Sequence, residues 1–312
     1  MRVTKMTTHA GAEVTDIDLA RGRPDSEIAS LRAALLEHKV LFFSDQDLDH
    51  ASHIEFARRF GPVTAAHPLI DTSESAFPEI LTVDNLANER KYGKSAAERR
   101  RTQTSPLSSW HSDLTPVVNP PSIGILRAQT VPAFGGDTQW CNLVAAYQGI
   151  SPAVRAMLET LAAEHRYLAG YQSAEPDDRY HRTVAARPLA AVHPVVRRHP
   201  ETGESALFVN PLFTHRILGL TGAESRHVLA MLFEQLTDPA FTVRYRWRAG
   251  SVAMWDNRAT AHTPPADLAG PVERVLHRVS VVGEVPVGVG GRRSYALDGD
   301  PWPAHRHGDA AG

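Results

Sequence analysis

The pattern that most limits the fold is a succession of short strand-like segments, with few helices between them, from residue 80 onward. The clearest is "FTVRYRW", residues 241–247, where apolar and polar side chains alternate as in a strand with one buried face. A doubly wound parallel sheet needs a helix between successive strands. The sequence therefore predicts a mainly β chain with flanking helices, built on a double-stranded β-helix, or jelly roll, core.

Other segments complete this expectation. Strands are predicted at "PEILTVDN", "IGILRAQ", "SVAMWD" and "RVLHRVSVVGEV", and a hairpin turning at "ETGE" is predicted within "VVRRHPETGESALFVN". Helices are predicted after a cap at Asp25 or Ser26, over Asp49 to Phe60, after Ser151-Pro152, and after a capping box formed by Thr221 and Glu224. "KVLFF" is predicted to be a buried strand between the first two helices.

The domain organisation follows from this pattern. Residues 1–286 are predicted to form one jelly-roll domain with N-terminal helices. The polar, basic segment 85–109 is predicted to be a mobile lid loop, and the tail 287–312, rich in Gly, Pro and His, is predicted to be peripheral.

Composition excludes several classes of function. The formal net charge is -2, which gives no general attraction to nucleic acid or to an anionic membrane. The single cysteine, Cys141, excludes an internal disulfide framework and a thiolate zinc cluster. No apolar leader or membrane-spanning run is present. We therefore expect a cytoplasmic protein in which any bound metal is held by His and carboxylate.

The stretch "SSWHSDLTPVVNPP" raises the question of metal binding. His111 and Asp113 are two residues apart, so in an extended segment both side chains point the same way, while Ser112 points away. The pair could ligate a metal, form a hydrogen bond, or simply lie at a strand end. The motif alone does not separate these readings.

A third candidate ligand is His262 in "WDNRATAHTPPAD". In a jelly roll, strands far apart in sequence lie side by side, so this imidazole can converge with the first pair. Two His and one carboxylate form the facial set of non-haem Fe(II) oxygenases, whereas a lone loop His is more often bonded to a backbone carbonyl.

Two arginines form a further candidate site: Arg274 and Arg278 are four residues apart on a predicted strand and so share one face. They are either surface arginines or a pair that meets an anion.

The motifs together resemble the TauD/TfdA family of Fe(II)/2-oxoglutarate-dependent dioxygenases, in its taurine dioxygenase and alkylsulfatase branch. The segments that carry the resemblance are "WHSDLTP", "GGDTQW", "HPVVRRHPETGESALFVN", "WDNRATAH" and "RVLHR". They occur in the family's order, and the similarity runs from about Lys5 to Val287. Four short motifs and one longer stretch in the same order are far more specific than any one of them.

The resemblance implies a role for each matching residue. It implies that the iron ligands are His111, Asp113 and His262. It implies that 2-oxoglutarate is bound by Thr138 and Arg274, and that the substrate is bound by His67, Tyr171, Phe213 and Arg278.

The chain departs from the taurine enzyme at Ile70 and Leu107, where apolar residues replace polar substrate contacts. A less polar pocket suits an alkyl chain better than taurine.

The resemblance also implies a function. We expect Fe(II) as cofactor, 2-oxoglutarate and O2 as cosubstrates, and a small molecule with an anionic head group as substrate. An alkyl sulfate or alkylsulfonate, hydroxylated with release of sulfate or sulfite, is the first reading. The alternatives are the same chemistry on a carboxylate, such as an aryloxyalkanoate, amino acid or natural-product intermediate, and a non-catalytic jelly-roll binding protein. Family members are often dimers or tetramers, so a homo-oligomer is expected.

Overall fold

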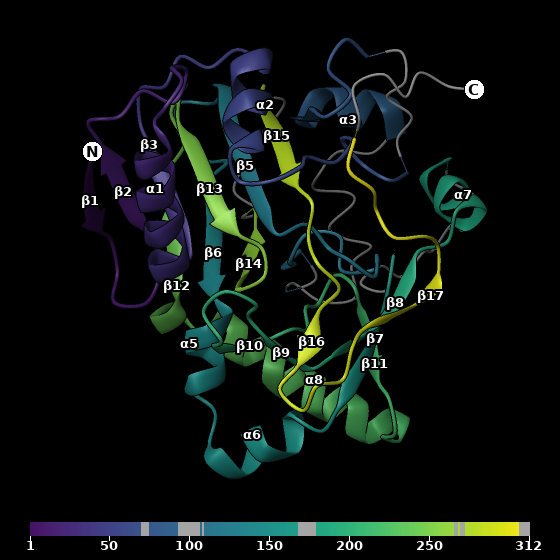
Figure 1. The fold of residues 1–312 in the computed structure, drawn as a ribbon. Coiled ribbons are helices and arrows are strands. Elements are labelled where there is room, and N and C mark those ends of the chain that lie inside the picture. The colour runs from purple at the N-terminus through teal and green to yellow at the C-terminus, as the bar shows by residue number, and fades with distance from the viewer. Residues whose placement is uncertain are drawn as a thin grey trace.

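A computed structural model gives the fold of the chain and describes residues 1–69, 75–92, 107, 109–167, 179–264, 268 and 272–305 (Figure 1). The protein is mainly β, with helices packed outside its sheets. The strands are β1 Arg2–Lys5, β2 Ala12–Thr15, β3 Val40–Phe43, β4 Leu81–Asp84, β5 Ile123–Thr130, β6 Thr138–Asn142, β7 Ala162–Arg166, β8 Ala190–Pro194, β9 Val196–Arg198, β10 Ser205–Leu207, β11 Thr214–Ile217, β12 Thr242–Tyr245, β13 Val252–Asp256, β14 Thr260–Thr263, β15 Val275–Val281, β16 Val287–Gly288 and β17 Tyr295–Asp298. The helices are α1 Asp25–His38, α2 His50–Arg58, α3 Asn85–Tyr92, α5 Leu143–Gln148, α6 Pro152–Leu158, α7 Arg179–Ala186 and α8 Gly222–Thr237, with a short 3-10 helix, η1, at Pro239–Phe241.

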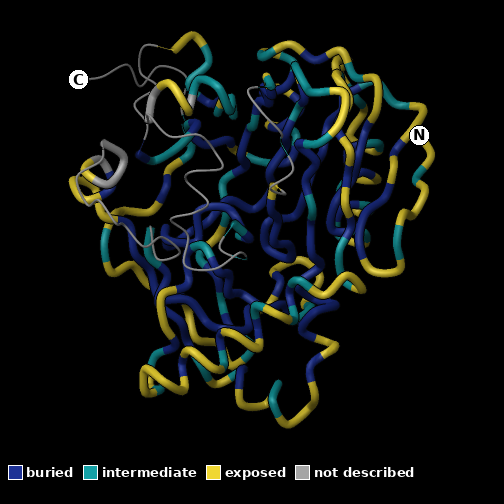
Figure 2. The backbone as a smooth tube through the Cα atoms, turned by 180° about the vertical axis from the view of Figure 1, so that it is seen from behind, coloured by how far each residue is buried: buried dark blue, intermediate teal, exposed yellow. Residues whose placement is uncertain are grey.

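The largest sheet has seven strands in the order β1-β2-β3-β13-β5-β15-β4. Its neighbours are antiparallel except for the β2–β3 pair. α1 and α2 cover one face of this sheet (Figure 1). Ile28, Leu31 and Leu35 of α1 are buried, and their spacing places them on the helix face that meets the sheet. Figure 2 shows the buried residues gathered in the interior of the molecule, with exposed residues along its rim.

Three smaller sheets complete the β structure, in the orders β12-β6-β14, β10-β9-β16 and β11-β7-β8-β17. A second apolar cluster joins these sheets to the helices α5 and α8. The predicted capping box begins α8: Thr221 Oγ1 accepts from the Glu224 N–H, and Glu224 Oε2 accepts from the Thr221 N–H. The three-stranded sheet around β6 matters most for function, because its strands carry residues predicted for the site.

The predicted strands are confirmed where alternation is clearest. Val243, Tyr245 and Trp247 are buried, whereas Arg244 and Arg246 are exposed. The hairpin that turns at "ETGE" is also confirmed as the antiparallel pair β9–β10. An antiparallel pair with such a short connection needs only local contacts, so short-range sequence signals are enough to identify it.

The helix starts are predicted less well. α2 begins after Asp49 as expected, with a capping box to Ser52. The predicted side-chain cap of α1 is wrong, because Pro24 precedes the helix and no side chain caps it. Ser151 and Pro152 do begin α6, but the Ser151 side chain makes no capping hydrogen bond.

Two expectations about irregular segments need correction. Residues 85–92, expected to be part of a mobile loop, form the helix α3, which starts where the Asp84 carboxylate accepts from the Ala87 N–H at 2.9 Å. Residues 93–106 and 108 lie outside the described residues, so the predicted lid there is untested.

The segment after Val287, expected to be peripheral, pairs into two sheets instead. β16 pairs with β9, and β17 pairs with β8. Trp302 then packs in an apolar cluster with Leu114 and Val117, residues just beyond Asp113. A buried Trp contributes much apolar area. The Gly- and Pro-rich composition of this segment therefore led us to underestimate how far it packs against the rest of the protein.

The helices in the described part of the chain were compared with the length and hydropathy of a membrane span. None of them is long and apolar enough to cross a membrane.

We predict that Trp302→Ala lowers the free energy of unfolding by about 3–5 kcal/mol, the usual cost of removing a buried aromatic side chain. Trp302 is 5% exposed, whereas Tyr295 in the same segment is 50% exposed. Tyr295→Ala is therefore the matched control and should change stability by well under about 1 kcal/mol. Urea unfolding measures both, and a loss in Trp302→Ala as small as the loss expected for Tyr295→Ala would show that the segment is peripheral after all.

Candidate active site

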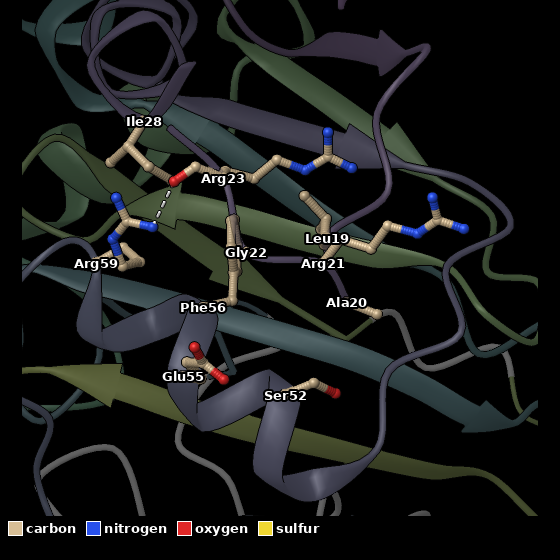
Figure 3. A pocket seen from close by; sticks show the side chains of 10 residues that line it. All are labelled: Leu19, Ala20, Arg21, Gly22, Arg23, Ile28, Ser52, Glu55, Phe56 and Arg59. Carbon is tan, nitrogen blue, oxygen red and sulfur yellow. Dashed lines mark hydrogen bonds between the residues drawn. The ribbon is translucent and has the colours of Figure 1, made fainter. Parts of the chain in front are cut away.

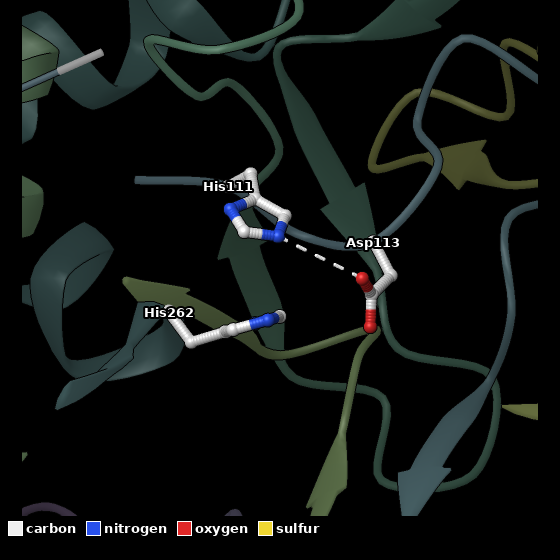
Figure 4. A group of neighbouring side chains, drawn as sticks. All are labelled: His111, Asp113 and His262. Carbon is white, nitrogen blue, oxygen red and sulfur yellow. Dashed lines mark ion pairs between the residues drawn. The ribbon is translucent and has the colours of Figure 1, made fainter. Parts of the chain in front are cut away.

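Three candidate ligands converge in the structure. One ligand atom from each of His111, Asp113 and His262 lies within 4.8 Å of the others (Figure 4). His111 Nε2 is 3.7 Å from Asp113 Oδ1, and the centroids of the two imidazole rings are 4.3 Å apart. Asp113 and His262 are buried, and His111 is partly exposed. The three side chains thus face a common point, as the sequence predicts.

The backbone fixes the two histidines directly. The His111 N–H donates to the His262 carbonyl at 2.9 Å, and the His262 N–H donates to the His111 carbonyl at 2.7 Å. This reciprocal bridge is antiparallel. His262 lies on β14, which pairs with β6, so the bridge also attaches His111 to this sheet.

Asp113 is held in a different way, by side chains of the β13–β14 turn and its surroundings. The Asn257 amide bonds both backbone groups of Asp113: its Oδ1 accepts from the N–H at 2.7 Å, and its Nδ2 donates to the carbonyl at 3.1 Å. The neighbouring Ser112 Oγ donates to the Thr260 carbonyl at 2.7 Å. Ser112 therefore binds away from the point that the ligands share, as expected for an extended segment.

Electrostatics prepares the three groups for a cation. Burial lowers the pKa of His262 to about 3 and also lowers the pKa of His111. Burial acts to raise the pKa of Asp113, but Arg278 and the two histidines outweigh it, so this pKa is lowered. Two neutral imidazoles and an ionised carboxylate are the protonation states in which these residues ligate metals.

A divalent metal fits this donor set. The Nδ1 of His111 is 2.8 Å from the Ser109 carbonyl, and donation to that oxygen leaves the Nε2 lone pair facing Asp113. Among the described residues, Asp113 Oδ2 is buried without a hydrogen-bond partner. A buried carboxylate oxygen in this position is costly unless a cation or donor meets it. Two His nitrogens and one carboxylate oxygen are a set that Fe(II) accepts.

Arg274 and Thr138 lie together, and Thr138 begins β6, the strand that pairs with the β14 strand of His262. Arg274 Nη2 donates to Thr138 Oγ1 at 3.4 Å, and its Nε donates to the Gly136 carbonyl at 2.8 Å. Trp247 Nε1 donates to the same Thr138 oxygen at 2.9 Å. Gly136 has a φ of +70°, and a Cβ there would be 2.9 Å from Arg274 Cδ. The glycine is therefore needed both for the turn and for the approach of the guanidinium.

Arg278 pairs with a candidate metal ligand, Asp113, a contact that the sequence did not predict. We expected this side chain to face solvent or a second anion, and it forms an ion pair with Asp113 through Nη1. Its side chain is only 10% exposed. Its Nε is buried with no hydrogen-bond partner in the described part of the chain, so the guanidinium keeps a donor for a further acceptor.

The structure describes some of the residues predicted for substrate binding and not others. Phe213 lies edge-on to His111, with ring centroids 6.0 Å apart. His67 Nε2 is 2.9 Å from the hydroxyl of Tyr167, whose ring is 5.4 Å from that of Phe213. Tyr171 and Ile70 lie outside the described residues, and Leu107 packs against the apolar cluster that joins the smaller sheets to α5 and α8.

Sequence reasoning missed two residues of this region. Tyr167 is distant in sequence from both His67 and Phe213, and no local pattern connects them. Asn257 stands inside the quoted motif "WDNRATAH", but the motif does not reveal which backbone its amide holds. A polar residue at a turn next to a candidate ligand was the available signal.

A surface pocket elsewhere carries no comparable chemistry. It lies between the loop before α1 and the helix α2 (Figure 3). Arg59 donates to the Arg23 carbonyl at 2.7 Å, and Arg23 donates in turn to the Asp18 carbonyl. These guanidiniums are thus engaged by the protein itself, and we assign no function to the pocket.

A buried hydrogen-bonded network continues from the loop after Asp113. His193 Nε2 donates to the Thr115 carbonyl at 2.7 Å, and its Nδ1 is 2.7 Å from Ser294 Oγ. His165 Nδ1 is 2.9 Å from Thr115 Oγ1. Both imidazoles are fully buried, and burial lowers the pKa of His193 to about 3. The network connects the ligand loop to the C-terminal segment.

Comparison with known proteins gives consistent matches over the whole chain. Residues 2–280 match the family described as "Taurine catabolism dioxygenase TauD, TfdA family". An alpha-ketoglutarate-dependent sulfate ester dioxygenase of Pseudomonas putida is 37% identical over 292 residues, covering 91% of this chain and 90% of the relative. An alkylsulfatase of Acinetobacter baylyi is 33% identical over 299 residues, covering 93% and 88%. The crystal structure of a putative alpha-ketoglutarate-dependent taurine dioxygenase from Burkholderia xenovorans has a TM-score of 0.80 and 40% identity, covering 96% of this chain and 99% of that one.

We predict that His193 makes stability depend on pH. Its folded pKa of about 3 lies below the value of roughly 6.5 in an unfolded chain, so the unfolded state binds more protons between these values. Stability is therefore full above pH 6.5 or so and falls as the pH decreases, by at most about 1.4 kcal/mol per pH unit for this group.

The check is the free energy of urea unfolding at about pH 5, 6 and 7. The slope of the free energy of unfolding against pH is proportional to the number of protons taken up on unfolding. His193→Gln should reduce this number by up to one, whereas His227→Gln, at an exposed position, should leave the slope unchanged. An unchanged slope in His193→Gln would show that another group takes up the proton.

Proposed function

The chain belongs to the TauD, TfdA family of dioxygenases, and on this premise we propose that it hydroxylates a small substrate with an anionic head group, most simply an alkyl sulfate or alkylsulfonate. The reaction class is that of a non-haem dioxygenase that uses Fe(II), 2-oxoglutarate and O2. The observation that carries the substrate proposal is the place of Arg278. Its mostly buried guanidinium lies at the candidate metal centre, and a second arginine, Arg274, bonds Thr138 where the cosubstrate is proposed to bind.

The proposal includes the finer topology of the fold. We infer that the sheets form a double-stranded β-helix, or jelly roll, as the sequence predicts. Support comes from the antiparallel pairing of strands far apart in the chain, such as β13 between β3 and β5, and β14 beside β6. A homo-oligomer, a cytoplasmic location and a lid within 85–109 remain predictions.

Each part of the site has a role in this proposal. His111, Asp113 and His262 would hold Fe(II). The bound iron, with 2-oxoglutarate and O2, supplies the chemistry that hydroxylates a C–H bond. Arg274 would pair with the far carboxylate of 2-oxoglutarate while Thr138 donates a hydrogen bond to it. The protein contributes orientation and anchoring, and the oxidising power belongs to the cofactor.

Arg278 would change its role when the metal is present. In the structure its charge offsets that of Asp113. With Asp113 bound to a divalent ion, the Arg278 guanidinium would no longer be needed to offset the carboxylate and would be able to share its donors with a substrate oxyanion. We propose that Phe213, and the pair of His67 and Tyr167, border the same pocket.

The product follows from the position of the new hydroxyl. On a carbon bearing a sulfate ester, hydroxylation gives a hemiacetal-type sulfate, in which the C–O bond to sulfate breaks as the new hydroxyl gives up its proton and its C–O bond becomes C=O. The proton leaves, and an aldehyde and sulfate remain. A sulfonate loses sulfite by the same route, with cleavage of the C–S bond.

There are two alternatives to this function: another substrate class and a non-catalytic role. A carboxylate is also an oxyanion that Arg278 can bind, so an aryloxyalkanoate, amino acid or natural-product intermediate would use the same site. The similarity to a sulfate ester dioxygenase and an alkylsulfatase favours the sulfur oxyanion. A non-catalytic binding protein is disfavoured, because the three candidate ligands converge and both predicted arginines make contacts inside the protein.

We predict that Arg274→Ala raises the KM for 2-oxoglutarate sharply, since a desolvated charge pair is worth about 2–5 kcal/mol. Thr138→Val should cost about 1 kcal/mol, the usual value of one hydrogen bond. Initial rates of succinate formation against 2-oxoglutarate concentration measure both. An unchanged KM in Arg274→Ala would place the cosubstrate elsewhere.

The function itself is tested with a panel of alkyl sulfates, alkylsulfonates, aryloxyacids and neutral alcohols, scored for succinate and for aldehyde. We predict that the sulfur oxyanions give the highest kcat/KM. Arg278→Ala should weaken them by a comparable 2–5 kcal/mol, roughly 30-fold or more, and should form succinate in excess of aldehyde.

The controls separate the possible outcomes. The KM for 2-oxoglutarate in Arg278→Ala should stay near the wild-type value, and Arg278→Lys should recover part of the activity. Arg248→Ala, at an exposed position, should behave as wild type. A neutral substrate that outperforms the anions, or a silent Arg278→Ala, would remove the anion pocket from the proposal.

A further inference from the structure

One buried side chain holds a candidate ligand without touching the metal position. Asn257 lies in the turn between β13 and β14 and is 1% exposed. Its amide accepts from the Asp113 N–H and donates to two carbonyls, those of Asp113 at 3.1 Å and Pro121 at 2.9 Å. Its own N–H donates to the Ser122 carbonyl at 2.9 Å. Asn257 thus closes the loop that begins at Asp113 and ends at Ser122.

Asp113 needs such a support because no strand holds it. His111 is fixed by its bridge to His262, but Asp113 lies in a turn. The next residue, Leu114, has a φ of +50°, so the chain leaves the extended conformation immediately after the carboxylate. The Asn257 amide occupies the place of a neighbouring strand, bonding both the N–H and the carbonyl of one residue.

The turn that carries Asn257 is itself anchored by charge. Asp256 accepts from Arg258 Nη2 at 2.7 Å and Nε at 2.9 Å, and its Oδ2 is 2.9 Å from His199 Nε2. Arg258 also bonds Glu201 on the β9–β10 hairpin at 2.6 Å. Asp256, Arg258 and His199 are buried, and Glu201 lies at the surface. A turn held at several points gives the Asn257 side chain a fixed position from which to orient Asp113.

We propose that Asn257 is a positioning residue of the metal centre: it sets the orientation of the Asp113 carboxylate and thereby the affinity and geometry of the bound metal. This inference rests on the proposed function, because it takes Asp113 as a ligand. Groups that orient ligands from outside typically change metal affinity 10- to 100-fold when they are removed, roughly the range expected here.

The alternative is that Asn257 only stabilises the loop, and the chain offers a matched control for that role. Asn119 is also a buried amide, and it also bonds both backbone groups of one residue. Its Oδ1 accepts from the Trp302 N–H at 2.7 Å, and its Nδ2 donates to the Trp302 carbonyl at 2.9 Å. Trp302 is not a candidate ligand. Loss of either amide should destabilise the fold, but only loss of Asn257 should affect the metal.

The experiment measures Mn²⁺ binding to the full-length, metal-free protein by calorimetry, without substrate or turnover. We expect Asn257→Ala to raise the dissociation constant about 10- to 100-fold. Asn119→Ala should stay within roughly twofold of wild type, while urea unfolding shows a loss of stability in both variants. The absorption bands of the Co²⁺-loaded protein should change shape in Asn257→Ala alone, since they report ligand geometry.

Two further variants keep the outcomes distinct. Asn257→Asp keeps the shape and the acceptor for the Asp113 N–H but loses the amide donor, so its Mn²⁺ affinity should fall between wild type and Asn257→Ala. It carries the same test if Asn257→Ala does not fold. Wild-type Mn²⁺ affinity in both Asn257 variants, or an equal loss in Asn119→Ala, overturns the positioning role.

Asp113→Ala is the reference for the proposed function, and it should abolish the same binding. If Asp113→Ala binds Mn²⁺ as wild type does, the metal centre itself is misplaced. If Asp113→Ala loses the metal and the Asn257 variants do not, only the positioning inference fails.

Discussion

The site depends on a backbone contact between two segments that are far apart in the chain. His111 and His262 exchange two hydrogen bonds, and directly paired residues of antiparallel segments project their side chains to the same side. That contact is enough to bring the two imidazoles together. β14, which carries His262, is paired with β6, which begins at Thr138. One small sheet therefore fixes two candidate ligands and a candidate cosubstrate contact, and a displacement of β6 would move all three.

Buried charge makes the adjoining turn rigid. Burial acts to raise the pKa of Asp256, but Arg258 and His199 outweigh it, so the carboxylate stays ionised well below its usual range. Breaking one partner of a buried pair leaves an uncompensated charge and costs about 3–5 kcal/mol. The contribution is fully present above the pKa of an unfolded carboxyl, about 4, and is lost only as the pH falls toward the lower folded pKa. The ion pairs of this turn therefore keep their full contribution to stability at neutral pH.

The sequence predicted what local patterns control and missed what long-range contacts decide. The strand β12 within the predicted segment 241–247, the helix start at Asp49, the capping box at Thr221 and the β9–β10 hairpin each depend on neighbours in the chain. The convergence of the three ligands was expected only because several motifs occurred together. Two contacts join distant segments: the hydrogen bond between His67 and Tyr167, and the bonds of the Asn257 amide to the Asp113 backbone. The spacing of these residues in the sequence does not predict either contact. The C-terminal strands were missed because a Gly- and Pro-rich composition hides the few residues, such as Trp302, that pack.

The ion pair at the metal position supports an anionic substrate. The Arg278 guanidinium offsets the charge of the ionised Asp113 carboxylate, and the two histidines are neutral. A divalent ion held by these ligands would compensate Asp113 in place of Arg278, which would leave the charge of a mostly buried guanidinium without its present partner. Uncompensated charge in a buried site is costly, so a substrate that brings a negative charge to Arg278 would stabilise the assembled site. An alkyl sulfate or alkylsulfonate supplies such a charge and leaves its alkyl chain for an apolar wall such as Phe213. A neutral substrate would leave the guanidinium charge in place, and a cationic substrate would add to it.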